Sequence, residues 1–442
     1  MEEKNYNGNI YFKDDNYEKS YPATLFFKSN SFNLEIQSHI DKGDYEVIQG
    51  EFIDLGFVTL INCRMSGQTM SIISYVNYSI QYIITNVKFN SRELIRASSM
   101  HIRMPILKEW INISNLEGNL VYKKQITYLG NKSFNFFSNE DIEISSILSL
   151  TQTTNIYEGI KIKEYAELEI KSKKGSISIF ELFEFYKRIK FLFNFFGFFN
   201  NENDVIYFKE KNKIFENQEN DILMRFYGLF LNSTNKGTVY HKKIYYKEIE
   251  KNINLVISNW LFNDLIKDSI NLVMEKYLLD KLSVETYFLN SAFSIETYHR
   301  NNINNKVYEE NEFETIRAGL LKKITDEKEK ELFLHKLQHA NEPSFRKRLK
   351  DFSQEIELIS SKKNSHFINE VVETRNYLVH RDKPTKNVLY MLDLYFVAIQ
   401  LESLTKYCIF KQIGINDEIL NEKFGDFKIK IENMIFLNTK KE

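Results

Sequence analysis

The chain has 442 residues and a formal net charge of −1, from 59 Lys and Arg residues against 60 Asp and Glu residues. This length predicts two or three domains, and the balanced charge argues against a protein that coats nucleic acid along its whole surface, although a local basic patch can still bind a polyanion. The two cysteines, Cys63 and Cys408, exclude a Cys-rich zinc site and argue against a disulfide framework, as is typical of the reducing cytoplasm.

The N-terminus and the most apolar stretch give no membrane signal. MEEKNYNGNIYF lacks a basic start followed by an apolar run, so we expect no signal peptide. The stretch FLFNFFGFF at 191–199 is too short to cross a bilayer and is expected to finish a buried helix. We therefore expect a cytoplasmic protein with no membrane partner.

Residues 1 to about 175 have the pattern of antiparallel strands. The segment YPATLFFKSNSFNLEIQSHI alternates apolar and polar side chains on both sides of a Ser-Asn turn, and short apolar runs recur in EVIQGEFIDLGFVTLINC, YSIQYIITNVKF and YEGIKIKEYAELEIKS. This spacing favours an antiparallel β domain, either a sandwich or barrel-like.

A first long helix is predicted to begin at Ser178. Ser178 and Glu181 form the S-x-x-E capping pattern, the following FELFEFYKRIKFLFNFF has helical spacing, and Gly197 provides a stop. Two more strands are expected at NDVIYFKE and GTVYHKKIYY. We assign residues 1–245 to a β-rich domain of one or two subdomains, with this helix near 178–197.

The sequence becomes helical from about residue 250 to the C-terminus. NLVISNWLFNDLIKDSINLVMEKYLLD, VETYFLNSAFSIETYHRNN and NSHFINEVVETRNYLVHRD carry apolar residues at helical spacing between short polar loops. The prediction is an α+β multidomain protein, with an N-terminal antiparallel β-rich domain followed by an all-α bundle over 250–442.

The helix FINEVVETRNYLVH carries the candidate site. Ile368, Val371 and Leu378 mark its apolar stripe. Arg375 lies on that stripe, where a guanidinium needs a carboxylate, a phosphate or several carbonyls to offset its desolvation. His380 stands about 140° further around an ideal helix. The two side chains share no face, so they can border one cleft only near the helix end or across a helix–helix interface.

A structural interpretation competes with a functional one. Arg375 can form an internal ion pair, and His380 can cap the helix C-terminus, where the dipole favours a cation and Pro384 supplies the stop. On spacing alone this structural interpretation is favoured, because an Arg and a His five residues apart are common.

The same residues resemble a known family. Arg375 and Asn376, followed after three residues by His380, match the R-N-x-x-x-H signature of HEPN domains. Upstream, SAFSIETYHRN resembles the early helix of ApeA-like HEPN proteins, with Glu296 in place. The segments GNIYF, YPATLFF, EVIQGEF and GFVTLINC resemble the β domain that precedes HEPN in that family. The resemblance covers most of the chain.

This resemblance implies an anti-phage, abortive-infection effector with a HEPN bundle. Such proteins are metal-independent endoribonucleases that cut host RNA, with tRNA as one candidate, and need no cofactor. They pair two motifs across a two-fold axis, so we expect a homodimer or a larger symmetric assembly. The β domain is expected to sense a phage-derived or infection-linked trigger.

RNA cleavage by these residue types is chemically consistent. The 2′-OH of RNA is the nucleophile, and the products are a 2′,3′-cyclic phosphate and a 5′-OH. We assign His380 to proton transfer and Arg375 to stabilising charge on the phosphoryl oxygens. Asn376 is assigned to orientation, and Glu296 is expected to hold Arg375 in its apolar stripe.

Two further groups of residues are weighed beside this site. His299 and Arg300 share a helix with Glu296, so His299 can approach the site. The stretch 343–386 holds ten Lys and Arg against six Asp and Glu, a net charge of +4, and is densest in FRKRLK at 345–350. These basic residues can guide RNA phosphates or form an ordinary solvated helix face.

A metal site is not expected. His335 and His339 stand one helical turn apart, but Lys336 occupies the place of the zincin glutamate and no third ligand is evident. Two function classes remain open: a ribonuclease effector, or a non-catalytic HEPN module for binding or dimerisation in a defence or regulatory complex.

Overall fold

The computed structural model of the chain describes the following residues: 3–28, 31–37, 43–69, 74–119, 125–155, 159–199, 204–215, 218–228, 240–279, 281–303, 306–338 and 340–439. The chain forms two compact units, one of residues 1–236 and 245–257 and the other of residues 237–244 and 258–442. The chain therefore passes between the units within 237–257.

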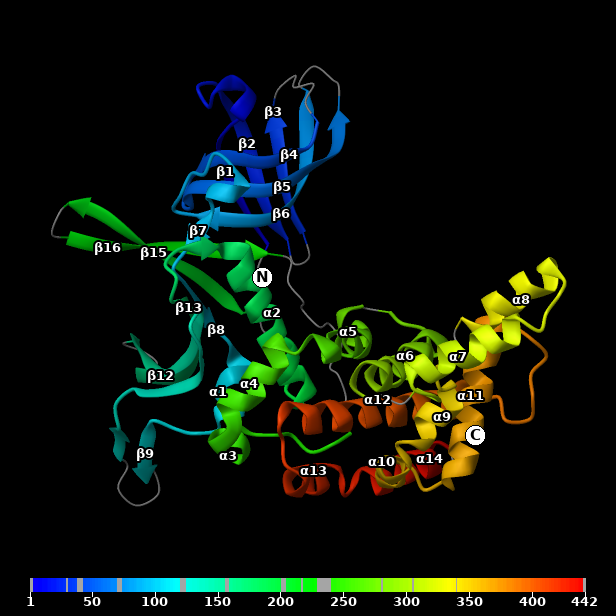
Figure 1. Cartoon of the computed structure of the whole chain (residues 1–442). Coiled ribbons are helices and arrows are strands. Elements are labelled where there is room, and N and C mark those ends of the chain that lie inside the picture. Colours follow the sequence, from blue (N-terminus) through cyan, green and yellow to red (C-terminus); the bar gives the residue numbers. More distant parts are fainter. Residues whose placement is uncertain are drawn as a thin grey trace. The chain divides into compact units, whose positions relative to one another are not determined.

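The first unit begins with a closed six-stranded barrel (Figure 1). Its strands are β1 (Lys4–Tyr11), β2 (Ser20–Lys28), β3 (Ser31–Gln37), β4 (Tyr45–Phe52), β5 (Gly56–Thr69) and β6 (Tyr75–Thr85). The antiparallel order is β6-β3-β2-β1-β4-β5, and β5 also pairs with β6, which closes the ring. In β2 and β3 every second side chain is buried, as the alternation of the sequence predicts.

A second sheet continues from the barrel. Its strands are β8 (Ser99–Arg103), β11 (Lys132–Ser138), β12 (Ile142–Asn155), β13 (Gly159–Ser172), β15 (Val205–Phe215) and β16 (Gln218–Gly228). They run antiparallel in the order β11-β12-β13-β8-β15-β16, and the end of β16 pairs with β6 of the barrel. Two small pairs complete the strands: β7 (Arg96–Ala97) with β14 (Ile177–Ser178), and β9 (Leu116–Asn119) with β10 (Gln125–Tyr128).

Three helices of the first unit enclose an aromatic core. They are α1 (Pro105–Ile111), α2 (Ile179–Phe195) and α3 (Tyr246–Ile249). The indole of Trp110 is fully buried and contacts four rings, those of Phe136, Phe193, Phe196 and Tyr246. The predicted helix after Ser178 is confirmed, since the Ser178 hydroxyl accepts from Phe180 N and Gly197 follows the helix with φ 96°.

The strand expected at GTVYHKKIYY is wrong for residues 240–245, which form no strand; residues 237–239 lie outside the described part. Instead, Tyr240 and His241 pack into the helical unit. The Tyr240 hydroxyl lies 3.2 Å from that of Tyr395, and the His241 ring stacks on Phe424. The alternating pattern here thus serves packing against helices, not pairing in a sheet.

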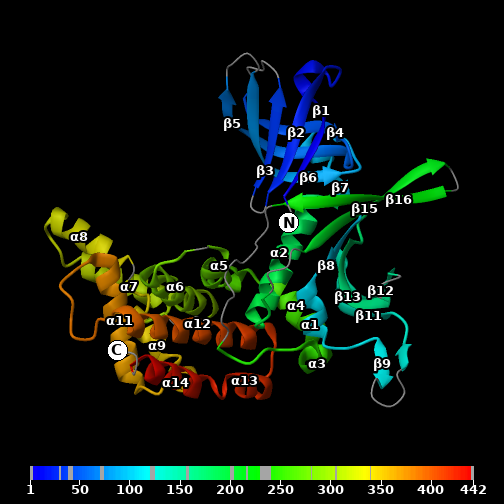
Figure 2. The same ribbon diagram turned by 180° about the vertical axis from the view of Figure 1, so that it is seen from behind.

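The second unit is all α-helical (Figures 1 and 2). Its helices are α5 (Asp264–Leu278), α6 (Val284–Asn302), α7 (Glu310–Leu321), α8 (Glu327–Leu337), α9 (Phe345–Lys350), α10 (Ser353–Ile359), α11 (Asn364–His380), α12 (Met391–Ile413), α13 (Asp417–Phe424) and α14 (Phe427–Thr439). Helix α4 (Ile253–Phe262) leads into it, and short 3-10 turns lie at Lys13–Asp15, Arg92–Leu94 and Glu250–Asn252. The predicted β-rich region followed by an all-α region is confirmed.

The long helix α12 is the core of the bundle. It is buried almost throughout and packs against α5, α6 and α10. Its Glu402 accepts hydrogen bonds from Tyr277 and Tyr287 and pairs with Lys276 at 2.8 Å and Lys406 at 2.7 Å. Burial alone would raise the pKa of Glu402, but the two ammonium groups lower that pKa overall. This cluster ties α5, α6 and α12 together. Among the described residues, no helix is both long and apolar enough to cross a membrane.

Candidate active site

Arg375 lies on α11 and points toward α6. Its Nη2 donates to Glu296 Oε2 at 3.2 Å, and its Nη1 donates to Asn376 Oδ1 at 3.2 Å. The guanidinium carbon is 5.6 Å from the ring centroids of both Phe293 and Phe345. The carboxylate and the two rings explain how an arginine fits into an apolar stripe. The structure therefore brings together three of the four predicted site residues.

The Arg375 side chain is held in place and is also partly exposed to solvent. It is 23% exposed, so one edge of the guanidinium can meet a ligand. Its Nε is buried and has no hydrogen-bond partner among the residues that the structure describes. A fixed cation with one exposed edge favours an anion that approaches this edge.

His380 is the last residue of α11 and is exposed. Arg381 adopts the left-handed conformation, with φ 57°, and its N–H donates to Tyr377 O at 2.8 Å, which ends the helix. The helix thus ends four residues before Pro384. Within the described part of the chain, the His380 ring has no hydrogen bond or ion pair, with Arg375 or with any other residue. Its two nitrogens are available for proton transfer to a ligand.

The segment after α11 is held against the helix, which fixes the surroundings of His380. Asn387 Nδ2 donates to both carboxylate oxygens of Glu373, at 3.0 and 2.9 Å, and the Thr385 hydroxyl also donates to Glu373. The Leu389 N–H donates to the Thr374 hydroxyl at 2.9 Å. The Thr385 hydrogen bond, which outweighs the opposing effect of burial, lowers the pKa of Glu373. The Glu373 carboxylate therefore stays ionised and accepts these hydrogen bonds throughout the neutral pH range.

His299 lies behind the site and is fully buried. Its Nδ1 is 3.2 Å from Arg348 Nη1, and its Nε2 is 2.9 Å from Asp351 Oδ2. A guanidinium only donates, so Nδ1 must accept and the proton must sit on Nε2, which donates to Asp351. Burial lowers the pKa of His299, and the hydrogen bond to Asp351 opposes this only in part. His299 is thus a neutral support for Arg348, out of reach of a ligand.

A chain of charges links this support to Arg375. Arg348 is 4% exposed and donates to Glu342 Oε2 at 3.2 Å. Arg300 lies 3.8 Å from Glu342 Oε2 and 3.7 Å from Glu296 Oε1, and Glu296 holds Arg375. The carboxylates of Glu296 and Glu342 are therefore shared between cations, which restricts the rotamers of all of them.

The basic stretch 345–350 does not behave as one surface. Phe345, Arg348 and Leu349 are buried, and Arg346 donates to Asn369. Lys347 is exposed and pairs with Asp351 at 3.0 Å, and Lys350 is exposed. Neither of the two interpretations left open for these basic residues, RNA guidance or a solvated face, fits Arg348, which is buried and paired. The sequence does not show this, because burial of one arginine among several depends on how α9 packs.

The remaining histidine pair provides no site within the described residues. His335 lies on α8 and is exposed, whereas His339 lies outside the described residues. No group of three or more His, Cys, Asp and Glu side chains gathers as metal ligands among the residues that could be searched.

Replacement of His299 tests whether this residue supports Arg348 in its neutral form. At pH values between the lowered pKa of His299 in the folded state and the ordinary histidine pKa of about 6.5, the unfolded chain binds more protons than the folded one. The free energy of unfolding therefore falls as the pH drops. His299→Gln keeps a donor for Asp351 and cannot titrate. We expect the melting temperature of the wild type to fall more steeply than that of the variant from pH 7 to pH 5. Parallel melting curves across this range would contradict the assignment.

Two models of known protein families match the chain. A family model described as Apea-like HEPN matches residues 289–419, and a model described as ApeA N-terminal domain 1 matches residues 5–260. The first match contains Glu296, Arg375, Asn376 and His380. No protein among the curated ones matches the chain.

One solved structure was found by similarity of fold. It is described as "MrkH, A novel c-di-GMP dependence transcription regulatory factor" and shares 12% identity with this chain. The match covers 38% of this chain and 77% of that one, with a TM-score of 0.15. No shared fold is inferred at this score.

Proposed function

The chain belongs to the ApeA-like HEPN family, whose members act in defence against phage, and from this premise we propose that it is a metal-independent endoribonuclease that cuts host RNA. One observation supports this proposal above the others. A half-buried arginine held by Glu296 and an unpaired, exposed histidine lie on the same helix, α11. A purely structural motif would not need a free histidine.

Each side chain has a defined task in the proposed reaction. The 2′-OH of RNA attacks the adjacent phosphorus, and His380 takes up or delivers a proton in this step. Arg375 stabilises the charge that develops on the phosphoryl oxygens, and Glu296 and Asn376 keep its guanidinium oriented. The products are a 2′,3′-cyclic phosphate and a 5′-OH. tRNA is the substrate that we propose first.

A non-catalytic HEPN module is the second candidate function. The internal partners of Arg375 favour it, since Glu296 and the rings of Phe293 and Phe345 would also suit a structural cation. Incubation of bulk RNA with the purified protein in EDTA distinguishes the two. Cleavage that depends on His380 supports the nuclease, and intact RNA supports the module.

The β-rich unit is proposed to restrain the nuclease and to sense the trigger. An RNase that is always active would kill its own cell, so a resting state is needed. We propose that an infection-linked ligand or phage protein binds this unit and shifts the population toward the active state.

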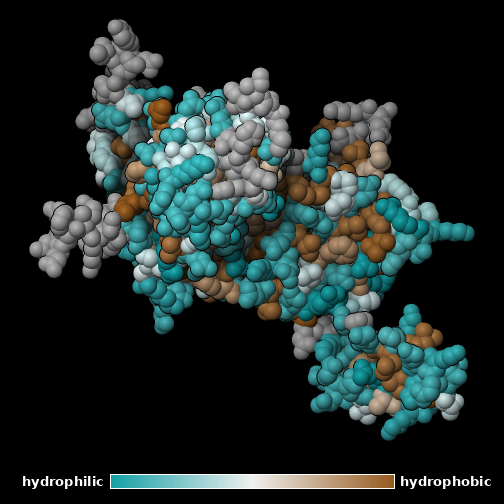
Figure 3. Space-filling model, turned by 90° about the horizontal axis from the view of Figure 1, so that it is seen from above, coloured by the Kyte–Doolittle hydropathy of each residue, from teal (hydrophilic) through white to brown (hydrophobic). Residues whose placement is uncertain are grey.

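Assembly into a homodimer completes the proposed site. One protomer supplies one His380, whereas transphosphorylation benefits from both an acid and a base. Apolar side chains reach the surface in several places, as the face drawn in Figure 3 shows. Four of them flank the segment that follows α11: Val379 beside His380, and Tyr390, Met391 and Leu392 at the start of α12, with Met391 82% exposed. We propose that a second copy covers this group across a two-fold axis.

The substitution Met391→Asp tests the dimer. Met391 has φ 48°, and aspartate tolerates this conformation, so the change adds charge without new backbone strain. We expect light scattering to show a shift from dimer to monomer and RNA cleavage to fall with it. Ile53→Asp, at a 68% exposed position in the barrel, is the matched control and should leave the dimer intact. A monomeric wild type that cleaves RNA at low concentration would contradict the proposal.

A further inference from the structure

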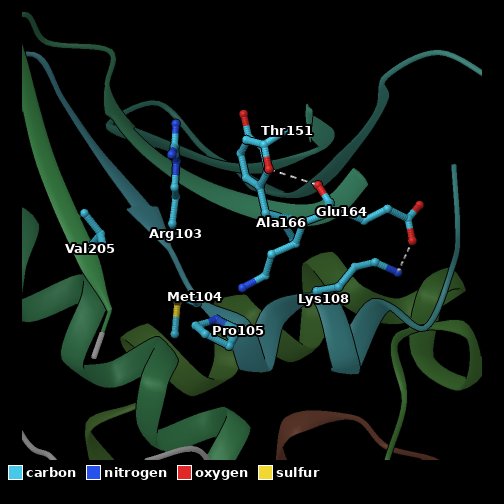
Figure 4. Close-up of a pocket in the computed structure, with 10 residues that line it drawn as sticks. Arg103, Met104, Pro105, Lys108, Thr151, Glu164, Ala166 and Val205 are labelled. Carbon is cyan, nitrogen blue, oxygen red and sulfur yellow. Dashed lines mark hydrogen bonds and ion pairs between the residues drawn. The ribbon is translucent and has the colours of Figure 1, made fainter. Parts of the chain in front are cut away.

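A cavity of about 420 Å³ lies in the β-rich unit, where β8 runs into α1 opposite strands β12 and β13. Figure 4 shows Met104 and Pro105 at its base, with Arg103 and Val205 on one side and the Lys108–Glu164 pair on the other. Its volume is within the range of small-molecule sites, roughly 300–1,000 Å³. The candidate nuclease residues all belong to the other unit.

The base of the cavity is apolar. Met104 and Ala166 are each 1% exposed, and Val205 and Pro105 are half-buried beside them. Such a base favours a flat, weakly polar group, since contact with it removes apolar area from water. The ring of Tyr165 forms part of the wall above it.

The walls carry more positive than negative charge. Lys108 is already engaged, with Ile113 O at 2.7 Å and Glu164 Oε2 at 3.3 Å. Glu164 in turn accepts from Asn115 N. Lys163 is exposed, and its ammonium has no partner among the residues that the structure describes. The one carboxylate of the lining is thus satisfied, and cationic donors remain.

Arg103 is pre-oriented for an anion. Its guanidinium carbon lies 4.6 Å from the centroid of the Tyr165 ring, and its Nε donates to Glu167 Oε2 at 3.3 Å. The two terminal nitrogens have no acceptor within the described part of the chain. A stacked guanidinium with both terminal nitrogens free matches the geometry of bidentate phosphate binding. It places the anionic end of a ligand beside the Tyr165 ring.

We propose that this cavity binds a small phosphorylated ring compound, of which a nucleoside monophosphate is the model. The ring would lie on the apolar base, and the phosphate would meet Arg103, with Lys163 as a further cation of the lining. A neutral apolar ligand would leave these donors unpaired, and a cavity of this size cannot enclose a polymer. This site is independent of the ribonuclease activity proposed above, because it is defined by binding and lies in the other unit.

Calorimetry on the full-length protein tests the ligand class. The panel is AMP, GMP, CMP and UMP, the matching nucleosides, ribose 5-phosphate and inorganic phosphate. We expect at least one nucleotide to bind about tenfold more tightly than its nucleoside, as loss of charged hydrogen bonds predicts, and more tightly than either phosphate without a base. Equal binding of the nucleoside, of ribose 5-phosphate or of phosphate would overturn the proposal, as would no binding at all.

Variants place the ligand in this cavity. Arg103→Gln and Lys163→Gln should each weaken nucleotide binding about tenfold or more. Lys171→Gln is the control, an exposed lysine on the same strand outside the cavity, and should bind like the wild type. If Arg103→Gln does not fold, Lys163→Gln decides alone, because that side chain is exposed. Unchanged affinity in a folded Arg103 or Lys163 variant would mean that nucleotides bind elsewhere, and this would overturn the site.

Discussion

Arg375→Ala and His380→Ala are each expected to abolish RNA cleavage and cellular toxicity. Loss of a proton-transfer group costs about 10²–10⁴ in rate, and loss of a donor to a developing oxyanion costs about 10²–10³. Purified full-length protein is incubated with bulk RNA in EDTA, and the 3′ ends are tested for a 2′,3′-cyclic phosphate. Cleavage at the wild-type rate by either variant would show that the residue is not catalytic.

Controls separate chemistry from folding in this experiment. His335→Ala removes an exposed histidine of α8 and should leave cleavage unchanged. Arg375→Ala leaves Glu296 with Arg300 as its remaining cation, so part of any loss can come from an unbalanced carboxylate. The double variant Glu296→Gln with Arg375→Ala removes this imbalance. If Arg375→Ala alone unfolds and the double variant folds and cuts RNA, Arg375 is structural.

The sequence predicts those helices and strands that are marked by a pattern within a few consecutive residues. The capping pattern of Ser178 and Glu181 marks the start of α2, because capping involves residues within one turn. Alternation of apolar and polar side chains likewise marks β2 and β3. Strand β16 is missed because QENDILMRFYG opens with four polar residues, although its main partner is the preceding strand β15. Closure of the barrel also needs β3 to pair with β6 and β1 to pair with β4, and no local pattern specifies these pairings between non-consecutive strands.

In the candidate site, too, some features follow from the sequence and others depend on packing. The need for a carboxylate beside Arg375 follows from its place in an apolar stripe, and the early-helix resemblance points to Glu296. The sequence does not reveal the contact of His299 with Arg348, because these residues are 49 positions apart and Arg348 stands among other basic residues. Only the packing of α9 against α6 decides which of these arginines is buried.

Removal of the barrel is the change that should most alter the response to phage. The barrel closes on itself and has its own apolar core, formed by strands β1 to β6. The end of β16 pairs with β6 over three residues, from Phe226 to Gly228. Deletion of residues 1–90 therefore takes away a body with its own core, and it uncovers Tyr227, which packs against that core. A deletion to about residue 240 would instead remove Trp110, which packs on Tyr246.

We expect this deletion to separate activity from triggering. If the barrel senses the trigger, the truncated protein either kills uninfected cells or fails to respond to phage, and in both cases phage-dependent protection is lost. Plaque counts and growth curves measure this, with the same deletion carrying His380→Ala to show that any toxicity needs the nuclease. Circular dichroism checks the fold, because Tyr82 of the barrel packs on Phe183 and Phe226. A folded truncated protein that still protects cells only when phage is present would show that sensing lies outside the barrel.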